Sequence, residues 1–143
     1  MHAPIWSEWM SWETFWNEGY KTTSMNNPGV YLLARFEDAP TGVANPEDAR
    51  VVYVGETTSQ VLSKRLYDFN RSAHEGKDGH SGGWTYRDLE KTGELPKGTL
   101  HVAVLAVPAE SHPFIRFYIK HTERAAIWRY VERHGKPPLC NRD

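Results

Sequence analysis

The sequence has little of what marks a secreted, disulfide-bonded or membrane-spanning chain. Its single cysteine, Cys140, excludes an internal disulfide and favours a reducing compartment. Residues 1–16 contain no lysine or arginine, so they lack the basic start of a signal peptide. No apolar run approaches the length of a membrane span. We therefore expect a cytoplasmic protein with no membrane partner.

Two common functional motifs are also missing. The seven histidines and one cysteine show neither HxxxH nor CxxC spacing, which argues against a zinc site. The glycine-rich stretch 76–83 lacks the preceding strand and the lysine-serine or lysine-threonine pair of a phosphate-binding loop. Neither a zinc enzyme nor a nucleotide-binding loop is therefore expected.

The length and charge of the chain fit one domain with a small bias towards anionic partners. A chain of 143 residues can bury a self-sufficient core. Residues 1–50 hold 3 Lys+Arg and 7 Asp+Glu, whereas residues 51–143 hold 14 and 11. The second part is therefore net positive, which mildly favours a polyanionic substrate.

Four tryptophans near the start of the chain follow helical spacing: Trp6, Trp9, Trp12 and Trp16. This spacing predicts a short amphipathic helix in an N-terminal extension, residues 1–27. The helix has three alternative roles: packing on the domain core, forming a homodimer or partner-protein surface, or stacking on unpaired bases.

Three apolar, β-branched runs predict strands: Val30–Phe36, Val51–Gly55 and Leu100–Val107. The first two form a hairpin with a long loop, residues 37–49, and the third is apolar enough to be central. Within the hairpin, period-2 alternation puts Tyr31 and Tyr53 on one face, so two phenols can lie side by side.

Helix signals lie between and after these strands. Leu62, Leu66 and Phe69 follow helical spacing within residues 61–73, behind candidate N-caps at residues 57–59. A last helix is bounded by Ser111 as N-cap and by Gly135 just past its end. The polar segment 76–93 is given no element. The predicted fold is α/β, a small, mainly antiparallel three-stranded sheet flanked by helices.

One carboxylate falls within an apolar helix face. On a helical wheel of the last helix, Glu123 lies at the centre of a group of apolar residues, namely Ile115, Ile119, Ala126, Ile127 and Tyr130. A buried carboxylate destabilises a fold by several kcal/mol unless it is paired or binds a cation. Glu123 therefore predicts either an internal salt bridge or a metal ligand.

Two tripeptides and three later residues resemble the GIY-YIG nuclease family. Gly29-Val30-Tyr31 stands for the first tripeptide and Tyr53-Val54-Gly55 for the second. Arg65, Glu123 and Asn141 follow in the order of that family's catalytic arginine, metal-binding glutamate and closing asparagine. The resemblance covers residues 28–141 and implies a nuclease domain at residues 28–143.

This resemblance implies a divalent-metal-dependent endonuclease that hydrolyses phosphodiester bonds in DNA. It implies that Glu123 binds Mg²⁺ or Mn²⁺ and that Arg65 contacts the scissile phosphate. Tyr31 would activate or orient the attacking water, and Tyr53 would assist it. Asn141 would orient the site through hydrogen bonds.

The chain departs from the family at one position. Many members carry a histidine or tyrosine one helical turn after the arginine, where this sequence has Phe69, which cannot transfer a proton. His80 or His74 could supply the missing group. The alternative reading is a catalytically impaired GIY-YIG-like domain that binds nucleic acid or protein, and a purely structural α/β domain is a third.

Further residues are expected to contact DNA phosphates, and most of them are basic side chains on the two predicted helices. They are Gly55, Lys64, Arg71, Lys120 and Arg124.

Overall fold

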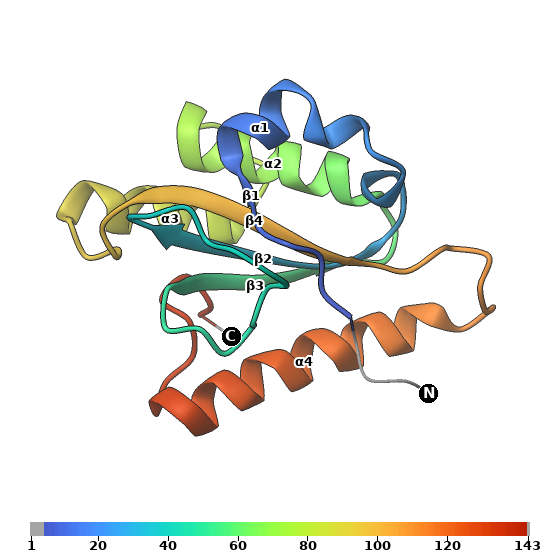
Figure 1. Cartoon of the computed structure of the whole chain (residues 1–143). Coiled ribbons are helices and arrows are strands. Elements are labelled where there is room, and N and C mark those ends of the chain that lie inside the picture. Colours follow the sequence, from blue (N-terminus) through green and yellow to red (C-terminus); the bar gives the residue numbers. More distant parts are fainter. Residues whose placement is uncertain (1–4, 143) are drawn as a thin grey trace.

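A four-stranded antiparallel sheet forms the centre of the structure, a computed structural model that describes residues 5–142 (Figure 1). The strands, in spatial order, are β1 (Met10–Ser11), β4 (Thr99–Ala106), β2 (Gly29–Phe36) and β3 (Val51–Thr57). The three predicted strands are present, and the prediction of three strands misses the short β1. An α/β fold with a small antiparallel sheet is confirmed.

The strand predicted to be central is an inner strand. β4 pairs with β2 along its whole length, and its residues His101 and Val102 also pair with β1. Both of its faces are covered, which explains why nearly every residue in it is apolar. β3 lies at the other edge of the sheet and pairs with β2 alone among the strands.

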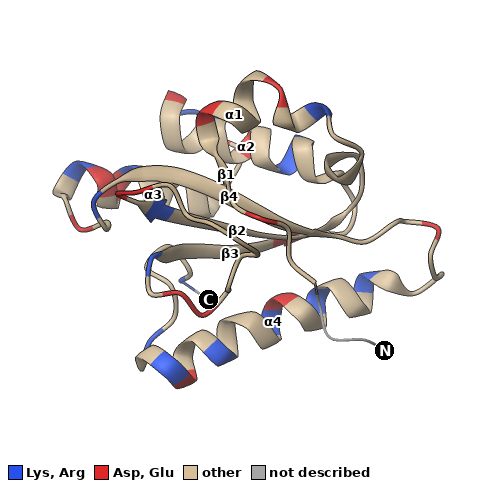
Figure 2. Cartoon of the chain, viewed as in Figure 1, with Lys and Arg blue, Asp and Glu red and all other residues tan. Residues whose placement is uncertain are grey.

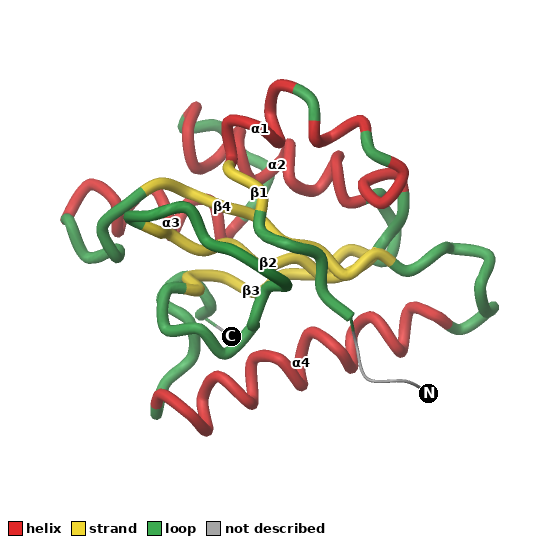
Figure 3. Tube along the Cα trace, viewed as in Figure 1, coloured by secondary structure: helices red, strands yellow, loops and turns green. Residues whose placement is uncertain are grey.

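Helices cover both faces of the sheet (Figure 3). α1 (Trp12–Asn17), α2 (Leu62–Glu75) and α3 (Ser81–Thr92) add residues to the core on one face, and α4 (Ile115–His134) adds residues to the core on the other. Two short 3-10 helices, Gly19–Lys21 and Thr23–Asn26, lead into β2. No helix within residues 5–142 combines the length and the apolar character needed to cross a membrane.

The apolar face of α4 is the one that its sequence predicts. Ile119, Ala126, Ile127 and Tyr130 are buried against the sheet. The helix ends at Gly135, whose φ of 80° is left-handed, as predicted for a terminal glycine. The predicted N-cap is wrong, because α4 begins at Ile115 and the hydroxyl of Ser111 donates instead to Pro108 O at 2.7 Å.

The start of α2 also differs from the prediction. None of residues 57–59 caps it, since Val61 is at the N-cap and makes no side-chain cap hydrogen bond. Thr57 instead closes the turn before the helix, where its hydroxyl accepts from Gln60 N at 3.1 Å and donates to Gln60 O at 3.0 Å.

The predicted helix through all four tryptophans is wrong. Residues 5–11 are not helical, and β1 pairs with β4 there, so only Trp12 and Trp16 belong to a helix. Trp6 is buried on the α4 side of the sheet, whereas Trp12 packs on the α2 side. The four tryptophans therefore do not share one surface, and a homodimer or partner-protein contact through this segment stays a prediction. Trp16 is 41% exposed and stacks on Tyr67 of α2.

Candidate active site

Tyr31 and Tyr53 lie on one face of the sheet, as the alternation of their strands predicts. Their ring centroids are 6.0 Å apart, and Tyr31 stands directly across the ladder from Gly55. A side chain at Gly55 would collide with the Tyr31 ring and lie 2.6 Å from the Tyr53 ring. Gly55 therefore leaves the space in which the two phenols pack. Its predicted contact with phosphate stays a prediction.

His80 is bonded to Tyr31 in the interior. Its Nε2 lies 2.6 Å from Tyr31 Oη, and its Nδ1 accepts a hydrogen bond from Gly83 N at 3.1 Å. Burial, and then the positive charge of Arg65, lower the pKa of His80 to about 3. The neutral ring must carry its proton on Nε2, because Nδ1 is an acceptor. His80 therefore donates to the oxygen of Tyr31.

The position of His80 follows from the start of α3. His80 is the N-cap residue of this helix, and its backbone N–H donates to Ser72 Oγ of α2 at 2.9 Å. A side chain at Gly82 would come within 2.6 Å of the Tyr53 ring, so the first turn of α3 lies directly against that tyrosine. The glycines of this segment are thus needed for close packing of α3 on the site.

The structure distinguishes the two candidate histidines. His74 is exposed at the end of α2, where its ring contacts those of Trp12, Phe69 and Tyr86. Phe69 packs edge-to-face on His80, with centroids 5.5 Å apart. Phe69, at the α2 position where the resemblance implies a proton-transfer group, thus supports the histidine at the start of α3.

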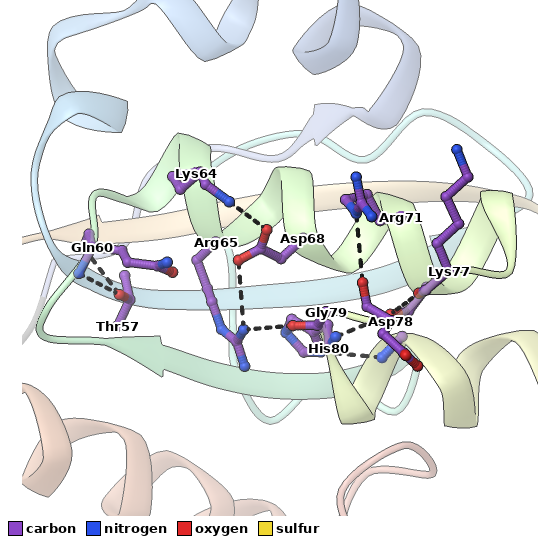
Figure 4. A network of polar contacts seen from close by, with 12 residues as sticks. Thr57, Gln60, Lys64, Arg65, Asp68, Arg71, Lys77, Asp78, Gly79 and His80 are labelled. Atoms are coloured by element: carbon purple, nitrogen blue, oxygen red, sulfur yellow. Dashed lines mark hydrogen bonds and ion pairs between the residues drawn. The ribbon is translucent and has the colours of Figure 1, made fainter.

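Arg65 projects from α2 towards the same tyrosines. Its Nη1 donates to Gly79 O at 3.1 Å and lies 3.8 Å from Asp68 Oδ2 (Figure 4). Gly79 immediately precedes His80, so this bond holds the guanidinium beside the histidine. The positive charge of Arg65 acts to lower the pKa of Tyr31, of Tyr53 and of His80.

Both phenols are protonated at neutral pH. Burial raises the pKa of Tyr31 well above its ordinary value, and the nearby Arg65 charge offsets this only in part. Burial likewise raises the pKa of Tyr53 to about 12, again against the effect of Arg65. The site at rest therefore contains two neutral phenols, a neutral imidazole and one guanidinium.

Glu123 approaches this group from α4. Its side chain is only 17% exposed, and Arg124 Nη1 is 4.0 Å from its Oε1. Burial, followed by the negative charge of Glu56, raises the pKa of Glu123, while Arg124 and Lys120 lower it. Glu123 and Tyr53 line the same pocket, and the charge of the carboxylate raises the pKa of the phenol. The predicted mostly buried carboxylate is thus present, and it lies close to a second one.

Asn141 closes the free edge of β3. Its Oδ1 accepts from Val54 N and its Nδ2 donates to Val54 O, both at 2.9 Å. The preceding residue continues this pairing, because Cys140 N donates to Val52 O at 2.8 Å. Asn141 therefore fixes the strand that carries Tyr53, a positioning role like the one implied by the resemblance.

A polar pocket of about 230 Å³ lies where β3, α3, α4 and the C-terminal segment meet. Tyr53, Glu123, Arg124 and Asn141 are among its lining residues. Tyr31 and His80 are buried behind Tyr53, since the rings of both contact the Tyr53 ring.

The predicted phosphate-binding side chains are spread over two helices on opposite faces of the sheet. On α2, Lys64 Nζ lies 2.6 Å from Asp68 Oδ1, and Arg71 Nε donates to Asp78 O at 3.5 Å. On α4, Lys120 Nζ is 3.7 Å from Glu56 Oε1, and Arg124 lines the pocket. Arg124 is thus the one of these four that borders the pocket.

Glu56 lies beside the site and was not among the predicted site residues. It follows Gly55 on β3 and points to the α4 face, because it pairs with Val30, whose side chain belongs to that core. Its Oε2 is buried and has no hydrogen-bond partner among the described residues. The alternation that put Tyr53 and Gly55 on one face would also have put this carboxylate on the other, apolar face.

The acidic groups of the site fit a hard divalent cation. Residues 5–142 contain no cluster of three or more His, Cys, Asp or Glu side chains that could hold a metal. Mg²⁺ needs fewer protein ligands, since it commonly keeps several waters and binds one or two carboxylates. Glu123, with a neighbouring carboxylate oxygen that lacks a partner, meets that requirement.

Comparisons with known protein families, with characterised proteins and with solved structures gave no match to this chain. Its function is therefore inferred from the geometry of these side chains.

Proposed function

We propose that this protein is a GIY-YIG-type endonuclease that hydrolyses phosphodiester bonds in DNA with Mg²⁺ or Mn²⁺. The observation that carries the proposal is the meeting of Tyr31, Tyr53, Arg65 and His80 beside Glu123, from five different elements. Structural tyrosines and arginines do not require such an arrangement. A phosphodiester-cleaving site does, because it must orient a water and stabilise charge on the phosphate.

The hydrogen bonds of Tyr31 suit it to handle the attacking water. As a neutral phenol it can orient that water, and it becomes a base only after losing its own proton. His80 donates to the phenol oxygen at 2.6 Å and Arg65 supplies positive charge nearby, and both interactions favour the phenolate. Tyr53, at the pocket boundary, gives the proton a path to the surface.

The remaining groups handle the phosphate. The guanidinium of Arg65 can pair with a non-bridging phosphate oxygen, since its fork of donors matches phosphate geometry. Glu123 would hold the divalent ion, and the chemistry supplied by a bound Mg²⁺ or Mn²⁺ is neutralisation of charge on the phosphate and the leaving oxygen.

Plasmid cleavage tests the proposal. We expect Mg²⁺- or Mn²⁺-dependent nicking or cutting that falls by about 100-fold or more in Tyr31→Phe, Arg65→Ala and Glu123→Ala. Tyr86→Phe is the matched control, because Tyr86 is another buried tyrosine whose hydroxyl accepts from Arg35 Nη1 at 3.0 Å, outside the site. Cleavage at the wild-type rate by the first three variants would contradict the proposal.

A second candidate function is DNA binding without cleavage. Phe69 favours it, because this residue replaces the proton-transfer group that many family members carry on the same helix. Salt-sensitive DNA binding together with no metal-dependent cleavage would select this reading.

A further inference from the structure

We propose that Glu56 is a second protein ligand of the divalent cation, shared with Glu123, so that the free protein binds the ion before DNA arrives. The inference rests on the proposed function, because that function is what calls for a cation beside Glu123.

The surroundings of Glu56 are unusual for a carboxylate. It pairs with Val30 and lies two residues after Val54, and both valines are fully buried on the same face of the sheet. Its side chain is 22% exposed, and Oε2 is buried with no hydrogen-bond partner among residues 5–142. A buried carboxylate oxygen with no donor destabilises the fold, so its presence indicates a use for that negative charge.

The lysine beside Glu56 does not satisfy it. Lys120 Nζ is 3.7 Å from Oε1, beyond hydrogen-bond reach, and its side chain is 58% exposed. A loose, exposed pair of this kind contributes little to stability. The pair with Lys120 also leaves Oε2 without a partner, whereas a divalent cation could bind that oxygen as a ligand.

Glu56 reaches α4 close to Glu123, because its Oε1 lies 3.7 Å from Nζ of Lys120, which precedes Glu123 by three residues, about one turn, on that helix. Two carboxylates this close repel each other unless a counter-ion lies between them. One divalent cation would turn this repulsion into attraction to both carboxylates. A site with two carboxylates holds an ion without help from substrate phosphate, which a single carboxylate does less well.

Binding of Mn²⁺ alone, followed by the electron paramagnetic resonance signal of free Mn²⁺, tests the inference without DNA. We expect wild type to bind Mn²⁺ and both Glu56→Gln and Glu123→Gln to weaken that binding by about tenfold or more. Glu132→Gln is the control, because it removes an exposed carboxylate from the same helix, and it should bind as wild type does.

Lys120→Met separates a ligand role from a structural one. If Glu56 serves only to pair with Lys120, this variant should resemble Glu56→Gln. If Glu56 is a ligand, removing the competing ammonium should tighten Mn²⁺ binding by severalfold.

Thermal unfolding gives a second readout. Without metal, Glu56→Gln should melt at or above the wild-type temperature, because the repulsion between Glu56 and Glu123 is relieved. With Mn²⁺, the melting temperature of Glu56→Gln should not rise as that of wild type does.

The outcomes distinguish this inference from the proposed function. DNA cleavage by wild type, with unchanged Mn²⁺ affinity in Glu56→Gln, overturns the ligand role and leaves the nuclease intact. Mn²⁺ binding that needs both carboxylates, without any DNA cleavage, overturns the nuclease and leaves the ion site. Wild type that does not bind Mn²⁺ without DNA overturns the inference.

Discussion

At the scale of single residues, His80 is held neutral by burial and by a positive neighbour. It accepts one hydrogen bond through Nδ1 and makes the other through Nε2, so both ring nitrogens are used in the neutral form. A second proton would have to displace the Gly83 N–H from Nδ1 and would put a cation next to Arg65. Protonation of His80 is therefore coupled to disruption of the site.

This coupling predicts a pH-dependent loss of stability. The pKa of His80 is about 3 in the folded protein and about 6.5 in an unfolded chain, so the unfolded state binds more protons between these values. The contribution of neutral His80 is complete above about pH 6.5 and is lost as pH falls towards 3, by about 1.4 kcal/mol per pH unit.

Urea unfolding at several pH values measures this effect. His80→Asn should flatten the fall in unfolding free energy on the acid side, because asparagine keeps the N-cap acceptor but does not titrate. The exposed His121→Asn is the control and should keep the wild-type slope. Equal slopes in wild type and His80→Asn would contradict a neutral, buried His80.

Some residues of the site could be identified from the sequence, because each stands out within its helix or strand. Glu123 stood out because it lies in the apolar face of a helix, and Tyr31 and Tyr53 because of their strands and the family resemblance. His80 was left open beside His74, since no local sequence pattern indicates which of these two histidines reaches a buried phenol. Only the start of α3 decides between them.

At the scale of elements, α3 brings the site together, and it is the helix that the sequence did not predict. Its first turn contains Gly82 and Gly83, which are poor helix formers. They are there because neighbours approach closely: a Cβ at Gly83 would lie 2.8 Å from Phe69 O, and one at Gly82 would lie 2.6 Å from the Tyr53 ring. Tertiary contacts stabilise this helix in spite of its low local helix propensity, which is why the sequence alone indicated a loop.

The tryptophan spacing failed for the opposite reason. Its 3.6-residue period was a coincidence, because backbone pairing of Met10 and Ser11 with β4 takes the chain across the edge of the sheet. β2, β3 and β4 were predictable from their apolar, β-branched runs, and α2 and α4 from the helical spacing of their apolar residues.

The close contact of α3 with β3 gives a prediction for Gly82→Ala. The added methyl group must displace the Tyr53 ring, so we expect a loss of about 1–3 kcal/mol in unfolding free energy, and slower DNA cleavage. Ser81→Ala, an exposed position in the same turn, should change stability by less than about 0.5 kcal/mol. Unchanged stability and cleavage in Gly82→Ala would contradict the close packing of α3 against Tyr53.

At the scale of the whole molecule, basic side chains lie on both sides of the sheet. Lysines and arginines recur along α4, on the face opposite α2 (Figure 2). The pocket opens at the β3 edge between these layers, so a DNA strand entering it would meet α4 through Arg124. Lys64 lies on α2, on the opposite side of the sheet from α4, and is not among the residues that line the pocket.

The salt dependence of DNA binding should reflect this difference. In an inactive Glu123→Ala background, Arg124→Ala should reduce the slope of log affinity against log salt by about 1, as expected for one lost phosphate contact. Lys64→Ala should change the slope less. Fluorescence anisotropy with labelled DNA at several salt concentrations measures both, and equal slopes for the two variants would contradict a path along α4.

The hydrogen bonds between the C-terminal segment and β3 also bear on how copies of this protein behave towards one another. An uncovered outer strand is a template on which a second molecule can add its own strand, and aggregates grow in this way. Here Cys140 and Asn141 occupy the backbone groups of Val52 and Val54 that such a strand would use. Residues that border the pocket therefore also keep the sheet of each molecule separate from the next.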